Sequence, residues 1–372
     1  MAEMESIGEL CQLINGYAFK SSDWSSEGTP IVRIQNLNNI LAEFNYFNGE
    51  LDEKYYIDNG TLLFSWSGTP GTSFGAFIWN RGPAIINQHI FRVITKKKIN
   101  TFYLKYALNG KLSDIIAKSH GGVGLQHITK KDLEKITILV PSLDVQNKIV
   151  MTLNSLENIL EKRKQQLSKL DQLVKSRFIE MFGDPVINTK KFPVFRMDEV
   201  VKFVGGSQPD KKYFEYSPTP DNIRLIQIRD YKSDKFITYI PKSMAKRHCT
   251  ADDIMIGRYG PPIFQILQGI EGSYNVALMK AVPLRGNKEF IRYFLKQDAL
   301  LHYLESLSSR TAGQDGIQMD KLKEYPFPFP PLIDQETFVT FTKQVEKAKS
   351  SIKQSLEKLE TLKKSLMQEY FG

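Results

Sequence analysis

Two short segments combine small, hydroxyl-bearing and cationic residues directly after an apolar run. Residues 65–72 (SWSGTPGT) follow TLLF, and residues 257–262 (GRYGPP) follow DIMI. Small residues let a backbone approach a nucleic-acid groove, hydroxyls and backbone N–H groups bind phosphates or base edges, and arginine pairs with guanine. The pattern favours DNA contact, with ordinary tight turns as the alternative. The candidate residues are Ser65, Trp66, Ser67, Thr69 and Thr72 in the first segment, and Arg258 and Tyr259 in the second.

Polar residues also follow two other predicted strands at matching places. Gln35 and Asn36 come after IVRI, and Arg229 and Asp230 come after LIQI. Amides suit adenine and arginine suits guanine, so Gln35, Asn36 and Arg229 are candidates for reading different bases. The alternative is that these side chains cap turns.

Two further loops are rich in Gly or Ser and lie near a cation. Such loops make good phosphate contacts, and flexible connectors are the alternative. The candidates are Lys118, Gly122 and Gln126 around GGVGLQH (121–127), and Arg310, Thr311 and Gln314 in SSRTAGQ (308–314). Outside these loops, Lys20, Ser21 and Gln208 are further candidates for DNA contact.

No segment matches a familiar catalytic or metal-binding motif. The chain has no P-loop, no HExxH and no Asn/Asp-Pro-Pro-Tyr/Phe segment of the kind that holds a target adenine. Its five His residues are scattered singly, and Cys11 and Cys249 lack CxxC spacing. We therefore expect a binding protein rather than an enzyme, with no metal, no cofactor and no disulfide framework of its own.

Composition indicates a globular protein with an anionic partner. Of 372 residues, 41% are hydrophobic and 24% are charged, which excludes a mainly disordered chain. The net charge of +9 suits nucleic acid or an acidic membrane surface. No apolar run approaches the ~18 residues of a membrane helix, and no signal peptide is evident. These observations favour double-stranded DNA over a membrane, and the two separated cysteines fit the reducing cytoplasm.

The sequence repeats itself, since residues 141–183 align without a gap to residues 330–372. Apolar residues in the first copy recur at alternating spacings of three and four from 149 to 181, interrupted by Arg163 and Arg177. This spacing predicts a coiled-coil seam and a helix that spans about 60 Å.

The second copy carries a similar but not identical stripe. It has Lys349 and Lys363 where the first copy has Leu160 and Val174. We therefore predict that the two helices pack on each other rather than each on a copy of itself.

The segments ahead of these helices are rich in β-branched and aromatic residues and resemble each other weakly but in order. Residues 31–37 match 225–231, residues 60–71 match 252–263, and residues 102–108 match 290–296. We predict an α+β fold with a pseudo-two-fold internal repeat, made of β-rich domains 1–140 and 184–329 and of helices 141–183 and 330–372. The helices carry only about +3 of the net charge, so most of it lies in the two domains.

This organisation predicts two readers on a rigid spacer. Two domains at a fixed separation would contact two half-sites a fixed distance apart. Because the domains have diverged while the helices are similar, the two half-sites should differ in sequence.

The whole chain resembles the specificity subunit of type I DNA restriction–modification systems. The resemblance rests on NGYAFKSSD (15–23), DDIMIGRYGPP (252–262), YNVALMKAVP (274–283), PSLDVQNKIV (141–150) and FIEMFGDP (178–185), and on the repeat itself. It implies two target-recognition domains separated by an antiparallel coiled coil, an asymmetric bipartite site, and two methyltransferase subunits bound to the helices. Those subunits use S-adenosylmethionine to methylate adenine, restriction or translocase subunits can join them, and the specificity subunit catalyses nothing.

Two other interpretations remain open at this point. The chain could be the recognition part of a split or truncated single-chain restriction–methyltransferase. It could also be a coiled-coil protein scaffold without a DNA role, although that leaves the paired β-rich domains unexplained.

Overall fold

The computed structural model describes residues 2–69, 72–119, 126–260, 262–307 and 316–372. They form two compact units: unit 1 comprises Met1–Gln166 with Ile352–Gly372, and unit 2 comprises Leu167–Ser351. Both units mix helix and sheet, as the sequence predicts.

The larger sheet of unit 1 has the strand order β2-β10-β6-β8, and every neighbouring pair is antiparallel. One face packs on helix α3 through Phe64, Phe91 and Tyr103, which are buried in one hydrophobic cluster. The elements are β2 Cys11–Asn15, β6 Leu62–Ser65, β8 Gly75–Ile78, β10 Ile90–Thr95, α3 Thr101–Gly110 and α4 Leu112–Ala117.

A second sheet of unit 1 has the order β4-β3-β9-β5, with β3 parallel to β9. Val32, Ile86 and Trp79 fill its core. The strands are β3 Thr29–Val32, β4 Asn45–Phe47, β5 Tyr56–Ile57 and β9 Ala84–Ile86. Residues 18–58, which supply three of these strands, are called lobe 1 below.

Unit 2 repeats both sheets. Its larger sheet has the order β14-β21-β18-β19, and its second sheet has the order β16-β15-β20-β17, with β15 parallel to β20. Residues 208–250, which supply β15, β16 and β17, are called lobe 2. The elements are β14 Val201–Gly205, β15 Asn222–Ile226, β16 Tyr239–Pro241, β17 His248–Cys249, β18 Ile254–Gly257, β19 Gln265–Gln268, β20 Gly272–Tyr274, β21 Leu278–Pro283, α8 Lys288–Leu295 and α9 Asp298–Leu307.

Short elements close each unit in the same way. In unit 1, β1 pairs with β12 beside α1 and α5; in unit 2, β13 pairs with β22 beside α7 and α10. Their bounds are β1 Glu3–Ser6, α1 Ile7–Leu10, α5 Lys130–Glu134, β12 Thr137–Val140, β13 Val194–Arg196, α7 Met197–Val200, α10 Met319–Glu324 and β22 Pro326–Pro328.

Two of the three predicted sequence matches are confirmed, and the third was misaligned by one residue. Residues 31–37 and 225–231 both contain the parallel strand of the second sheet, and residues 60–71 and 252–263 both contain an inner strand of the larger sheet. Asn100 and Asn287 cap α3 and α8 in the same way, which aligns Tyr103 with Phe290. The sequence match aligned Phe102 with Phe290 instead, because both helices have aromatic residues at neighbouring positions.

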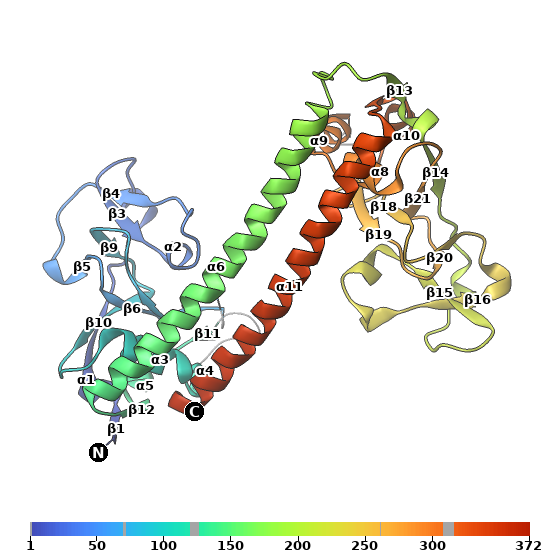
Figure 1. Ribbon diagram of the computed structural model, residues 1–372. Helices are drawn as coiled ribbons and strands as arrows, with labels where there is room; N and C mark the ends of the chain where they lie inside the picture. The colour runs from blue at the N-terminus through green and yellow to red at the C-terminus, as the bar shows by residue number, and fades with distance from the viewer. Residues whose placement is uncertain (1, 70–71, 120–125, 261, 308–315) are drawn as a thin grey trace. The chain divides into compact units, whose positions relative to one another are not determined.

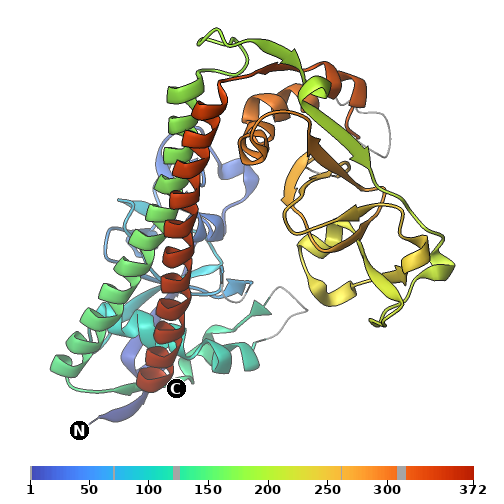
Figure 2. The same ribbon diagram turned by 45° about the vertical axis from the view of Figure 1, so that its right-hand side comes forward.

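The two predicted long helices are confirmed as α6 (Leu143–Phe182) and α11 (Leu332–Phe371). In unit 1, the start of α6 shares a core with Phe371 at the end of α11. In unit 2, Phe178 near the end of α6 packs against Phe338 near the start of α11, with ring centroids 5.5 Å apart. The helices are therefore antiparallel, as both views show (Figures 1 and 2).

The polar interruptions of the second stripe have partners on the first helix. Lys349 Nζ lies 2.8 Å from Asp171 Oδ1 in unit 2, and Lys363 Nζ lies 2.7 Å from Glu157 Oε1 in unit 1. These ion pairs explain why the two stripes differ. One seam position was wrong, since Phe178 rather than Arg177 enters the core, while Arg177 pairs with Glu180.

Gly183 ends α6. Its φ is +73°, and its N–H donates to Ile179 O at 2.7 Å. This left-handed conformation closes the last turn, and glycine adopts it without steric cost.

A buried glutamine ties each long helix to the domain before it. Gln146 accepts a hydrogen bond from the Asn100 N–H at 2.9 Å and donates to Pro141 O at 2.8 Å. Gln335 makes the same two bonds with Asn287 and Pro330, both at 2.8 Å. Each glutamine thus fixes the start of α3 or α8 against its long helix.

Candidate nucleic-acid interface

In unit 1, the strands that lead into the candidate loops end at one edge of the larger sheet. Strands β2 and β6 both run antiparallel to β10, so they end where β10 begins. The Gly16 N–H donates to Ile90 O at 3.0 Å, and the Trp66 N–H donates to His89 O at 3.2 Å. The loops after β2 and β6 therefore lie on either side of the turn 87–89.

The second sheet delivers its loop to the same turn. The Asn87 N–H donates to Val32 O at 3.1 Å, and the Tyr17 N–H donates to Ile86 O at 2.9 Å. The segment with Gln35 and Asn36 therefore begins beside the loops that follow β2 and β6.

Unit 2 repeats this convergence around the turn 275–277. Gly206, Arg258 and Asn275 donate their backbone N–H groups to Leu278 O, Ala277 O and Ile226 O at 3.0, 2.9 and 3.0 Å. The structure thus brings three candidate segments of each unit to one edge, which the sequence order alone did not reveal.

Gly16 and Gly206 make this close approach possible. A Cβ atom on Gly16 would lie 2.1 Å from Asn87 O, and one on Gly206 would lie 1.9 Å from Asn275 O. No side chain fits there, so the two glycines keep the loop backbone against the turn.

Several predicted site residues are buried and shape the loops. Ser65 donates to Ser67 O at 3.0 Å, and both serines are buried. Asn36 is also buried, and its Oδ1 accepts the Arg33 N–H at 2.9 Å. The turn-capping alternative therefore describes Asn36, and also Asp230, which accepts the Gln227 N–H at 3.1 Å.

Trp66 is held in place from two sides. Its indole Nε1–H donates to Asn15 Oδ1 at 3.0 Å, and its ring stacks on Phe91 with centroids 5.8 Å apart. It borders an apolar cavity of about 370 Å³, which is lined by Asn15, Trp66, Phe91, His127, Ile128, Thr129 and Lys130. Such a fixed ring presents an apolar edge of constant shape.

The other candidates of unit 1 whose side chains the structure describes lie at the surface. The Thr72 N–H donates to Thr69 O at 3.2 Å. The exposed candidates here are Lys20, Ser21, Gln35, Thr69, Thr72 and Lys118.

In unit 2, Arg258 is a cation at the edge. Its guanidinium lies over the Tyr259 ring at 5.3 Å from the centroid, and its Nη1 lies 3.5 Å from Val276 O. No carboxylate among the described residues pairs with it. Arg229 and Gln208 are exposed, and Arg229 donates to Thr238 Oγ1 at 3.0 Å.

Some predicted site residues lie outside the described residues. These are Gly122, Arg310, Thr311 and Gln314. The flanking strand β11 (Gln126–His127) pairs with β7 (Ser67–Gly68), which places the Gln126 backbone opposite Gly68. In unit 2, a bridge joins Tyr259 and Gly316 at the corresponding place.

Sequence reasoning missed the turn residues themselves. Gln88 and Val276 occupy the same place in the two turns, and Val276 is 41% exposed. The Asn87 side chain accepts the Gln88 N–H at 2.7 Å, and the Asn275 side chain accepts the Ala277 N–H at 3.2 Å. The signal was the shared Asn in INQHI and YNVAL.

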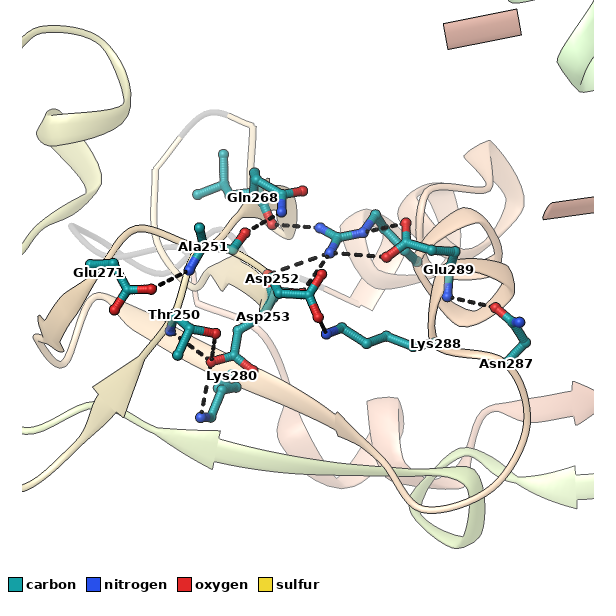
Figure 3. Close-up of polar contacts among 12 residues, drawn as sticks. Thr250, Ala251, Asp252, Asp253, Gln268, Glu271, Lys280, Asn287, Lys288 and Glu289 are labelled. Atoms are coloured by element: carbon teal, nitrogen blue, oxygen red, sulfur yellow. Dashed lines mark hydrogen bonds and ion pairs between the residues drawn. The ribbon is translucent and has the colours of Figure 1, made fainter. Parts of the chain in front are cut away.

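A polar network anchors the strand that presents Arg258 (Figure 3). Arg292 of α8 is 5% exposed; it pairs with Glu289 at 3.0 Å and donates to Asp252 O at 3.2 Å. Lys280 lies 3.2 Å from Asp253. These contacts fix the start of β18, and therefore also the loop at its end.

The pKa values of two carboxylates of unit 2 shift in opposite directions. Burial raises the pKa of Asp230, although the Gln227 N–H and the Arg224 and Arg229 guanidiniums oppose the shift. Burial also acts on Asp253, but the Thr250 N–H and the Lys280 ammonium outweigh it and lower its pKa. In unit 1, burial lowers the pKa of His89, and nearby His127 adds to the effect.

Within the described ranges, no group of three or more His, Cys, Asp or Glu side chains could hold a metal ion. None of the described helices combines the length and the apolar character that a membrane-spanning helix needs.

In comparison with known proteins, one family model matches this chain in two segments. The model of the type I restriction modification DNA specificity domain matches residues 2–170 and 189–361. The EcoBI specificity subunit of Escherichia coli is 28% identical over 173 residues, covering 46% of this chain and 35% of the relative. The MjaVIII specificity subunit of Methanocaldococcus jannaschii is 23% identical over 350 residues, covering 85% and 79%. The matched region thus spans about a third of the first relative.

Two solved structures share the fold. A crystal structure of a type I restriction–modification S subunit from M. genitalium has a TM-score of 0.58 at 14% identity, covering 100% of this chain and 96% of that one. A structure from work on the assembly and conformational transition of the type I system has a TM-score of 0.55 at 15% identity, covering 100% and 97%. Because the family model matches nearly all of both repeats, the chain belongs to the type I restriction modification DNA specificity domain family.

Proposed function

We propose that the chain is a non-catalytic subunit that recognises a bipartite, asymmetric sequence in double-stranded DNA. The observation that carries this proposal is the convergence of candidate loops at one sheet edge in both units, with different side chains at equivalent places. Trp66 stands where unit 2 has Arg258, and Gln88 stands where unit 2 has Val276. An amide reads adenine, arginine reads guanine and an apolar side chain contacts the thymine methyl group, so each edge would prefer a different sequence.

The partners follow from the family and from the helices. Two methyltransferase subunits would bind the long helices and would carry S-adenosylmethionine, while restriction or translocase subunits would join them in a complex that also cleaves. On this proposal the protein works in the cytoplasm, where the DNA lies.

A binding experiment tests this function against a scaffold role. The chain and its methyltransferase subunits are mixed with a library of duplexes that carry two randomised blocks separated by spacers of varied length. We expect enrichment of two different short sequences at one fixed spacing. Equal retention of all duplexes would contradict the proposal and would favour a scaffold.

A further inference from the structure

Lobe 1 and lobe 2 are equivalent in fold but opposite in charge. Lobe 1 (18–58) has three Lys or Arg residues and seven Asp or Glu residues, whereas lobe 2 (208–250) has nine and five. The formal charges are therefore −4 and +4. The two domains thus differ most in charge at the second sheet.

Most acidic groups of lobe 2 already have partners inside the lobe. Asp234 pairs with Arg224 at 2.9 Å, Asp210 lies 3.6 Å from Lys212, and buried Asp230 lies between Arg224 and Arg229. Six exposed cations of this lobe have no ion pair with any residue that the structure describes: Lys211, Lys232, Lys235, Lys242, Lys246 and Arg247.

The cations of lobe 1 leave no comparable surplus. Lys54 pairs with Asp52 at 2.8 Å, and Arg33 donates to Asn45 Oδ1 at 2.9 Å, which leaves Lys20 as an exposed cation. The exposed acidic residues of this lobe are Glu27, Glu43, Glu50, Asp52, Glu53 and Asp58. Such a surface is repelled by a phosphate backbone.

We infer that lobe 2 is a phosphate-binding surface for duplex DNA, whereas the acidic lobe 1 makes few phosphate contacts. The inference rests on the proposed function and adds that the two domains grip DNA unequally. The sheet edge where the candidate loops of a unit converge, around the turn 87–89 or the turn 275–277, is its reading edge. Lobe 2 continues directly from the reading edge of unit 2, because the Asn275 N–H donates to Ile226 O and Arg229 follows Ile226 in the chain. Phosphate contacts there would fix the register in which Arg258 meets a base.

The salt dependence of binding tests this inference. Each neutralised phosphate contributes about 0.9 to the slope of log affinity against log salt. In the complex with methyltransferase subunits on the enriched duplex, the variant K242Q/K246Q/R247Q should lower that slope by about 2.7, if each cation meets one phosphate. It should weaken specific and random duplexes alike, since phosphates carry no sequence information.

A matched triple variant separates local from general charge effects. K190Q/K191Q/K202Q removes the same charge from exposed residues of unit 2 outside lobe 2, and it should leave the slope nearly unchanged. An equal fall for both triples would overturn the inference, as would an unchanged slope for the lobe 2 variant. If the wild-type complex selects no sequence, the proposed function itself fails. If the wild-type complex selects a sequence but the two triple variants give the outcome described above, only the inference about lobe 2 fails.

Phosphate ethylation interference on the wild-type complex gives an independent readout that needs no variant. More phosphates should be essential around the half-site of domain 184–329 than around the other half-site. Equal numbers on the two sides would contradict the unequal grip.

Discussion

Arg258 gives the most specific prediction about which side chains read bases. It is a cation at the reading edge of unit 2, and its equivalent in unit 1 is the fixed, uncharged Trp66. Arg258→Ala should relax one base position in one half-site and cost about 1–3 kcal/mol of binding to the best duplex. Selection on a randomised half-site measures this change, with Lys190→Ala as the control. A uniform loss over all sequences would show that Arg258 contacts phosphate instead.

Asp230 gives a prediction about pH. Its pKa is raised in the fold because of burial, so the folded state binds this proton more tightly than the unfolded state does. The stability that the proton confers is present below the ordinary pKa and is lost as the pH rises through the raised one. Asp230→Asn should remove that loss, since buried Asn36 makes the same capping bond in unit 1.

Urea unfolding of wild type and D230N between about pH 3.5 and pH 7 measures the effect of this substitution. As the pH rises, the free energy of unfolding of D230N should increase relative to that of the wild type. Asp221→Asn at an exposed position is the control. A constant gap would contradict the assignment.

At the scale of elements, the buried glutamines hold each domain on its long helix. Gln335→Leu leaves the Asn287 N–H and Pro330 O without partners and should lower the free energy of unfolding by about 2–4 kcal/mol. Thermal or urea unfolding measures this, and Gln344→Leu on the exposed face of α11 is the control. An equal effect of both variants would show that the bonds of Gln335 contribute nothing specific.

Glu157 makes the pairing of the helices depend on pH. Burial opposes its charge, but Lys363, Lys105 and the Tyr106 hydroxyl lower its pKa. The stability that the charged Glu157 carboxylate adds to the fold is therefore present above the ordinary pKa and is lost as the pH falls through the lowered pKa.

Glu157→Gln should accordingly lower the free energy of unfolding by about 1–2 kcal/mol at pH 7, because the group is partly exposed, and by little in acid. Glu161→Gln on the exposed face is the control. A loss that persists unchanged in acid would exclude the charge as its cause.

Sequence reasoning reached the elements better than the site. The helices were predictable because a repeat with a three-and-four spacing is visible in one dimension, and Lys349 and Lys363 marked where it needed ionic partners. The identity of Gln146 and Gln335 was visible too, but their bonds to backbone groups far along the chain were not. The reading edge depends on strand order, which brings Val32, Ser65 and Asn87 together, so buried Ser65 and Asn36 could not be told from exposed neighbours.

At the scale of the whole molecule, we propose that each domain reads DNA independently of the other. Exchanging residues 1–140 for the corresponding domain of another family member should change one half-site and leave the other, because each domain has its own reading edge.

Inserting one heptad at equivalent places in α6 and α11 should lengthen the spacer between the half-sites, while the half-sites stay the same. Duplex selection measures both, and an unchanged spacer would contradict the role of the helices as a ruler.

The most direct test of two dissimilar readers is modified-base sequencing of DNA from a cell that carries this chain and its methyltransferase subunits, compared with the same cell carrying the Arg258→Ala variant. We expect methylated adenines in an asymmetric bipartite motif with a fixed spacer, and a variant motif that is degenerate at one position of one half only. One uninterrupted motif, or degeneracy that appears in both halves, would contradict this expectation.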